Sequence, residues 1–181
     1  MLWRTQLRLG SSHQVELSVH LSFVLTLLVV TWVLGQALFP VIFPGWSPLV
    51  YWLVAIAVVL ADGVAGLFHE LGHSLAAMAK GRRVYRITLY GLAAAVRRSS
   101  GPSRPRDQIA IAMAGPLSHL LVASLLWAAW GLLPDDNQPL RVATGFPALT
   151  NLVMGAANLL PVSPLDGGRV ARALLACLLR C

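Results

Sequence analysis

The chain has 181 residues, of which 57% are apolar and only 12% are charged, and its mean hydropathy is +0.70. Soluble domains carry about 25% charged residues, so the composition excludes an ordinary soluble domain and indicates an integral membrane protein with a single domain, residues 1–181. The formal net charge of +7 comes from basic residues that flank apolar segments without any nucleic-acid-binding motif, so we expect no nucleic-acid partner.

The N-terminal part of the chain predicts a short strand followed by a membrane helix. Residues 13–20, HQVELSVH, alternate apolar and polar side chains, which is typical of a half-buried strand. An apolar run over residues 22–38 follows the strand. Because Arg4 and Arg8 precede this run, a secretory signal peptide is the alternative. The run is too long for a signal peptide and no small-residue cleavage site follows it, so we expect a retained membrane helix.

Four further apolar runs cover residues 49–79, 109–133, 146–160 and 170–179. The first two of these runs, like the run before them, reach the roughly 17–25 residues that a spanning helix needs. The last two are short and flank a segment rich in proline and glycine, so we expect broken helices that lie against protein or a water-filled cavity. The predicted fold is therefore an all-α polytopic membrane protein with about five spanning or partly spanning helices.

Charge between the apolar runs predicts the orientation of the chain in the membrane. Residues 80–106 contain eight Lys or Arg and no Asp or Glu, whereas the connection after the third run carries Asp135 and Asp136. Loops rich in Lys and Arg remain in the cytoplasm. We therefore expect a multi-pass protein of the cell membrane whose N-terminus and 80–106 loop are cytoplasmic.

The stretch LFHELGHSL, residues 67–75, places three ionisable side chains inside the second apolar run. His69 and His73 are four residues apart, so they share one face of a helix, and Glu70 lies beside them. This H-E-x-x-H pattern is typical of zinc sites in which two imidazoles bind the ion and the glutamate takes a proton from water. Two buried histidines held by hydrogen bonds are the alternative, but ionisable residues at membrane depth usually have a function.

A catalytic zinc ion usually has a third protein ligand, and the candidates are Asp62, His119 and Asp166. Asp62 lies about 10 Å along the helix from His69, so it cannot share the same ion. Asp166 lies in NLLPVSPLDGGR, residues 158–169. Prolines and glycines in this segment interrupt a helix and allow the backbone to turn a carboxylate toward a metal.

The later segment also contains the spacing N-x-x-P-x-x-x-L-D-G, formed by Asn158, Pro161, Leu165, Asp166 and Gly167. With this motif after H-E-x-x-H, the chain resembles the site-2 protease family of intramembrane zinc metalloproteases. The resemblance covers the chain from residue 15 onward.

The resemblance implies a role for each matched polar residue. His69, His73 and Asp166 would hold one zinc ion per chain. Glu70 would be the catalytic base, and Asn158 would place a polar group near the substrate.

Two lesser features are similar to the same family. Residues 84–96 occupy the place of its small membrane-associated β-hairpin, and AGPLSHL, residues 114–120, resembles its A-G-P helix element. His119 stands where that element commonly carries asparagine. Three roles remain open for this histidine: a contact to substrate or to a metal ligand, a hydrogen-bonded structural residue, or a metal ligand itself.

The function implied by the resemblance is that of a zinc metalloendopeptidase embedded in the lipid bilayer. It would cleave a peptide bond in or near a transmembrane segment of a substrate protein. One alternative is a non-catalytic zinc-binding membrane scaffold or regulator, which the presence of Glu70 disfavours. Another is a different class of membrane zinc peptidase with a ligating glutamate on a later helix, which the surroundings of Asp166 disfavour.

Overall fold

The computed structural model describes residues 6–12, 15–91, 93–98 and 104–179. Its elements in chain order are β1 (Gln6–Ser12), β2 (Val15–His20), α1 (Leu21–Val33), the π-helical η2 (Leu34–Leu38), α2 (Phe39–Ile42), α3 (Pro48–Ala79), β3 (Val84–Tyr90), β4 (Ala93–Arg98), α4 (Pro105–Gly131), α5 (Gln138–Asn158) and α6 (Asp166–Leu178). Several predictions include residues that lie outside the described ranges. These residues are Arg4, positions 13–14 of the first predicted strand, Leu92 in the hairpin and residues 99–103 of the basic loop.

Within the described residues, three helical segments are long and apolar enough to cross a membrane, and they cover Leu21–Ile42, Pro48–Ala79 and Pro105–Gly131. The first segment combines α1, η2 and α2 without a break. Only 11% of its most apolar 18-residue stretch is buried by protein, against 33% of the corresponding stretch in each of the other two segments. Such a large uncovered apolar surface is stable only when it faces lipid, so α1 lies at the periphery of the bundle.

The two later helices begin earlier than the apolar runs predicted. α5 begins at Gln138 rather than residue 146, because the Asn137 side chain accepts a hydrogen bond of 3.2 Å from the Leu140 amide and Pro139 occupies the first turn. α6 begins at Asp166 rather than residue 170. In both helices polar residues occupy the first turns, so the apolar run is shorter than the helix and begins after it.

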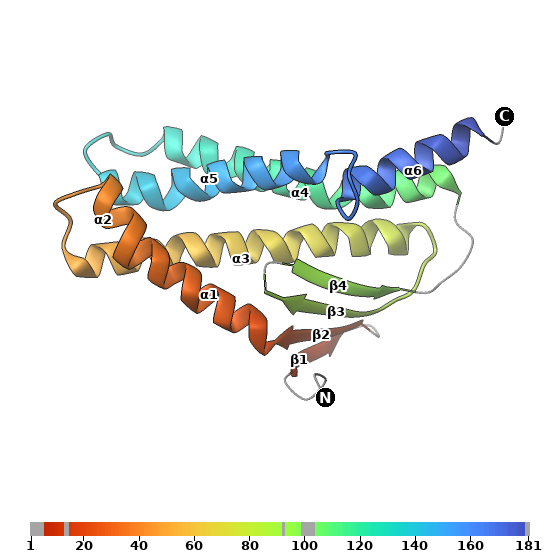
Figure 1. The fold of residues 1–181 in the computed structure, drawn as a ribbon, viewed down its shortest axis with the longest axis horizontal. Helices are drawn as coiled ribbons and strands as arrows, with labels where there is room; N and C mark the ends of the chain where they lie inside the picture. The colour runs from red at the N-terminus through yellow and green to blue at the C-terminus, as the bar shows by residue number, and fades with distance from the viewer. Residues whose placement is uncertain (1–5, 13–14, 92, 99–103, 180–181) are drawn as a thin grey trace.

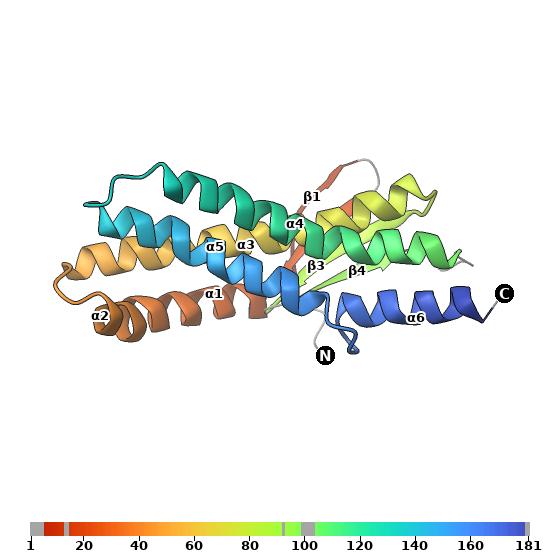
Figure 2. The same cartoon turned by 90° about the horizontal axis from the view of Figure 1, so that it is seen from above.

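Helices α3, α4 and α5 run side by side, and α6 packs against the first half of α4 (Figures 1 and 2). α1 diverges from α3 toward its own N-terminal end, where the chain enters it from β2 (Figure 1). The predicted fold class, an all-α polytopic membrane protein with a small β-sheet, is confirmed.

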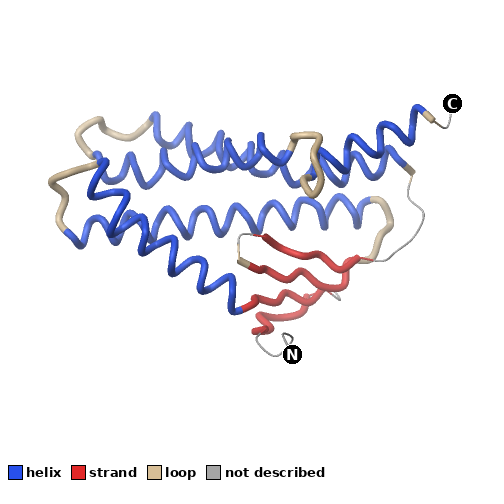
Figure 3. The backbone as a smooth tube through the Cα atoms, viewed as in Figure 1, coloured by secondary structure: helices blue, strands red, loops and turns tan. Residues whose placement is uncertain are grey.

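The strands form one sheet in the order β1-β2-β3-β4, which lies beside the C-terminal half of α3 (Figure 3). β2 and β3 are parallel, whereas the two outer pairs are antiparallel. Across the parallel pair, Arg86 donates a hydrogen bond of 2.8 Å from Nε to Glu16 Oε2. This ion pair connects the N-terminal strands to the predicted hairpin.

The hairpin predicted over residues 84–96 is present as β3 and β4, and the strand predicted over 13–20 is present as β2. β1 was not predicted. Its second half reads Gly10-Ser11-Ser12, and glycine and serine are weak strand formers, so pairing with β2 rather than local propensity determines this strand.

Two apolar clusters hold the helices together at different levels of α3. One consists of Leu34, Phe39, Tyr51, Val54, Ala55, Val58 and Val59. The other consists of Ala77, Val84, Ile87 and Ile111. The H-E-x-x-H residues lie between Val59 and Ala77, so packing on both sides fixes α3 where the polar side chains occur.

Candidate metal centre

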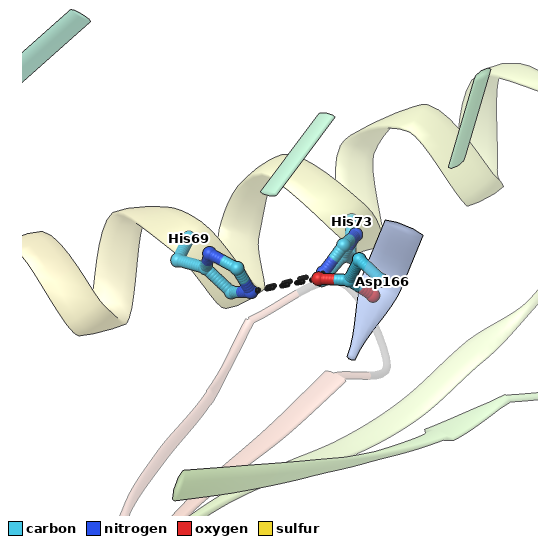
Figure 4. A group of neighbouring side chains, drawn as sticks. All are labelled: His69, His73 and Asp166. Atoms are coloured by element: carbon cyan, nitrogen blue, oxygen red, sulfur yellow. Dashed lines mark hydrogen bonds and ion pairs between the residues drawn. The ribbon is translucent and has the colours of Figure 1, made fainter. Parts of the chain in front are cut away.

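Three side chains from two segments that are far apart in the sequence converge on one point (Figure 4). His69 and His73 extend from successive turns of α3, and Asp166 is the first residue of α6. The Nε2 atoms of the histidines are 3.1 Å apart, and Asp166 Oδ2 lies 3.3 Å from that of His69 and 3.0 Å from that of His73. The structure thus brings together the three residues predicted to hold a metal.

The separations between these three ligand atoms fit tetrahedral coordination of a metal ion. Ligand atoms at the usual zinc distance of about 2.0–2.1 Å stand about 3.3–3.4 Å apart at the corners of a tetrahedron. Two imidazole nitrogens and one carboxylate oxygen are ligands that zinc accepts, and three protein ligands leave a fourth position for a reacting group. The residues His69, His73 and Asp166 are 9%, 3% and 7% exposed, so the site is largely enclosed by protein.

Hydrogen bonds orient two of the three candidate ligands. His73 Nδ1 lies 2.7 Å from the Ile111 carbonyl oxygen, which can only accept, so Nδ1 carries a proton and Nε2 presents its lone pair. Arg169 donates from Nη1 to Asp166 Oδ1 at 2.8 Å, which leaves Oδ2 for the histidines. Such contacts behind a ligand fix its orientation and increase its affinity for a metal.

Two glycines allow α4 to approach the imidazoles closely. A Cβ atom on Gly115 would lie 2.3 Å from His73 Nε2 and 2.8 Å from His69 Cε1. A Cβ atom on Gly72, which lies between the two histidines on α3, would lie 2.7 Å from the Ala114 carbonyl oxygen. Any side chain at either position would separate α3 from α4 or displace the rings.

Glycines in the L-D-G-G segment allow a similarly close approach of the backbone at the start of α6. A Cβ atom on Gly167 would lie 2.1 Å from the Leu159 carbonyl oxygen, and one on Gly168 would lie 2.6 Å from that of Val162. The chain that leaves α5 therefore folds back against the first turn of α6. This close return directs the Asp166 carboxylate toward α3.

The other predicted site residues, Glu70, His119 and Asn158, are not among the three converging side chains. Glu70 is half-buried on the same turn of α3 as His69. The His119 ring on α4 contacts the His69 ring, with centroids 4.9 Å apart, and it is not one of the converging ligands. Asn158, the last residue of α5, donates from Nδ2 to the Met154 carbonyl oxygen at 3.0 Å, so in this structure its amide bonds to its own helix.

Several residues of the site had no predicted role. Arg169 donates a hydrogen bond to Asp166, and Gly115 leaves room for the imidazoles of His69 and His73. Asn151 on α5 forms a hydrogen bond with His119. The run of two glycines and an arginine after Asp166 was visible as a motif. Gly115 was visible as part of the A-G-P element, but its contact with the imidazoles was not predicted. Asn151 could not be found from the sequence, because its partner His119 lies on another helix.

Comparison with known proteins identifies relatives over most of the chain. Residues 46–163 match the family described as peptidase M50B-like, a region that contains His69, Glu70, His73 and Asn158 and ends just before Asp166.

Among curated proteins, Rip3 of Mycobacterium tuberculosis, whose name assigns it provisionally to the zinc metalloproteases, is 32% identical over 95% of this chain. The protein sll0528 of Synechocystis, named in the same way, is 34% identical over 93% of this chain. The chain spans 44% of the length of each of these two relatives.

A solved structure, the site-2 protease from Methanocaldococcus jannaschii, has a similar fold. The TM-score is 0.65 with 24% sequence identity, and the alignment covers 94% of this chain and 72% of the other.

The close packing at Gly115 generates a prediction. We expect Gly115→Ala to reduce the metal content of the purified protein strongly, because the added methyl group occupies the space of both imidazoles. Metal analysis after affinity purification measures this. Gly131→Ala, on the same helix with open space around it, is the matched control and should retain the metal. Equal metal content in the two variants would contradict the described packing.

Proposed function

We propose that this chain, which belongs to the site-2 protease family and matches the peptidase M50B-like description over residues 46–163, is an intramembrane zinc metalloendopeptidase. It is a multi-pass membrane protein. The observation that supports the proposal most strongly is the convergence of His69, His73 and Asp166 beside Glu70, within a helix that is long and apolar enough to cross a membrane. Glu70 between the histidines also favours catalysis over the alternative of a non-catalytic scaffold.

The proposed cofactor is one zinc ion per chain, held by His69, His73 and Asp166. When bound there, zinc would polarise the scissile carbonyl and acidify a water molecule. Glu70 would take a proton from the attacking water and transfer it to the departing amine nitrogen. Burial of the site would strengthen each of these electrostatic contacts, because little water remains to screen them.

The proposed substrate is a transmembrane segment of another protein. A membrane helix satisfies its backbone hydrogen bonds internally, so its amide groups are inaccessible until it unwinds locally. β4 is an edge strand of the sheet and lies beside the half of α3 that contains the site. An unwound segment could pair with such an edge by strand addition, which would hold it extended for cleavage.

The first prediction of this proposal concerns the metal ligands. We expect alanine substitution of His69, His73 or Asp166 to abolish stoichiometric zinc binding, and zinc affinity to fall at low pH as the histidines become protonated. Zinc analysis of the purified variants measures both effects. His119→Ala is the matched comparison and should keep its zinc. If Asp166→Ala kept its zinc while His119→Ala lost it, the ligand assignment would be wrong.

The second prediction separates metal binding from chemistry. Glu70→Gln should retain zinc and lose cleavage, because it removes the base and leaves the ligands intact. Loss of a general base typically lowers the rate by about 10²–10⁴-fold. A fluorogenic peptide with an apolar transmembrane-length segment, interrupted by Gly-Pro to weaken its helix, serves as the substrate in detergent micelles. Wild-type turnover by Glu70→Gln would refute the mechanism.

The third prediction concerns the proposed orientation, with the 80–106 loop and the N-terminus in the cytoplasm. His69 lies eleven residues before Lys80, about 16 Å from that end of α3 by helical rise, so a substrate should be cut toward its cytoplasmic side. Single cysteines at Ser100 and Asn137, in a chain from which Cys177 and Cys181 have been removed, should react with a membrane-impermeant thiol reagent from opposite sides. Reaction of the Ser100 position from outside intact cells would reverse the orientation.

A further inference from the structure

A second group of polar side chains lies within the membrane-spanning part of the bundle, outside the candidate metal centre. Asp62 on α3 accepts hydrogen bonds at Oδ1 from Thr150 Oγ1 and from Asn151 Nδ2, both at 2.8 Å. Thr150 and Asn151 belong to α5. A carboxylate at membrane depth is expensive, and its retention indicates a function. Asp62 precedes His69 by about two helical turns and is not a metal ligand, so the metal does not account for it.

The hydrogen bonds of Asn151 determine which way its amide faces. Its Nδ2 atom lies 2.8 Å from the Pro147 carbonyl oxygen, which can only accept, and also donates to Asp62. The oxygen of the amide therefore faces His119, whose Nδ1 lies 2.6 Å from it. Asn151 is only 1% exposed, so water cannot replace these partners without opening the helix packing.

This orientation fixes the tautomer of His119. Because Asn151 Oδ1 can only accept, His119 Nδ1 must carry the proton, and in the neutral ring Nε2 then has a free lone pair. Asn151 is the one hydrogen-bond partner that the described part of the chain gives His119. The ring lies beside the His69 ring, 4.9 Å between centroids. A hydrogen-bond acceptor is thus held next to the metal centre from three helices.

We propose that Asp62 and Asn151 are positioning residues that act through His119, and that His119 Nε2 accepts a hydrogen bond from a backbone N–H of the bound peptide. The inference rests on the proposed function, since it needs a peptide beside the metal centre. A substrate strand in a site with little water must find partners for its N–H groups, because an unpaired one is costly. His119 offers such a partner beside one of the candidate ligands.

A double-mutant cycle tests whether Asp62 acts through His119. Asp62→Leu should lower kcat/KM for the fluorogenic peptide by about tenfold with zinc content unchanged, the size expected when one buried hydrogen bond is lost. In a His119→Ala background the same substitution should have an effect of less than about twofold. Equal losses in the two backgrounds would show that Asp62 acts independently of His119 and would overturn the proposal.

Two further variants separate positioning from a general structural effect. Asp62→Asn should retain more activity than Asp62→Leu, because an amide oxygen can still accept from Asn151. Equal loss in both would contradict the role of Asp62 as an acceptor. Ser124→Ala, which removes an exposed hydroxyl bonded to the Leu120 carbonyl on its own helix, is the control for removal of a polar group and should keep full activity.

A spectroscopic measurement tests the hydrogen bonds from Asp62 through Asn151 to His119 independently of cleavage. Nitrogen NMR of isotope-labelled histidine, with His119 assigned from its absence in His119→Ala, should show a protonated Nδ1 and an unprotonated Nε2. The opposite tautomer would overturn the proposal even if the protein is an active protease. If the protein showed no zinc-dependent cleavage, the proposed function would fail and so would the role of His119 toward a peptide. The tautomer would then still decide whether Asn151 positions the ring.

Discussion

The requirement that two imidazoles and a carboxylate share one small space inside a membrane bundle governs the rest of this structure. Each of these groups is costly at membrane depth, and together they become favourable only around a common partner such as a metal ion. His69 and His73 meet this requirement by helical spacing alone, whereas Asp166 must be brought to them from the far end of the chain. Close packing between helices makes that approach possible.

Glycine provides the necessary space on both sides of the site. Gly72 and Gly115 let α3 and α4 touch at the level of the imidazoles, and Gly167 lets the chain fold back before α6. Membrane helices associate without the hydrophobic effect that operates in water, so small residues at the contact matter more than apolar area. The apolar clusters above and below the site then hold this arrangement in place.

The sequence predicted the local features of this protein and missed those that depend on partners from other segments. The spacing of His69 and His73 and the break before Asp166 were visible, because each is a short-range pattern. The start of α5 was placed too late, since its first turns contain polar residues that hydropathy treats as loop. Asn151 was missed because nothing near it in the sequence indicates that it faces His119 on another helix.

X-ray absorption at the zinc edge of the purified wild-type protein distinguishes the possible ligand sets of the metal. A centre formed by His69, His73 and Asp166 should give a first shell of light atoms only, at about 2.0–2.1 Å, with the scattering pattern of two imidazoles and no sulfur. A sulfur ligand at about 2.3 Å would instead indicate binding by Cys177 or Cys181, the two cysteines of the sequence. A shell with three imidazoles would place His119 in the ligand set in place of Asp166. Either result would contradict a centre formed by His69, His73 and Asp166.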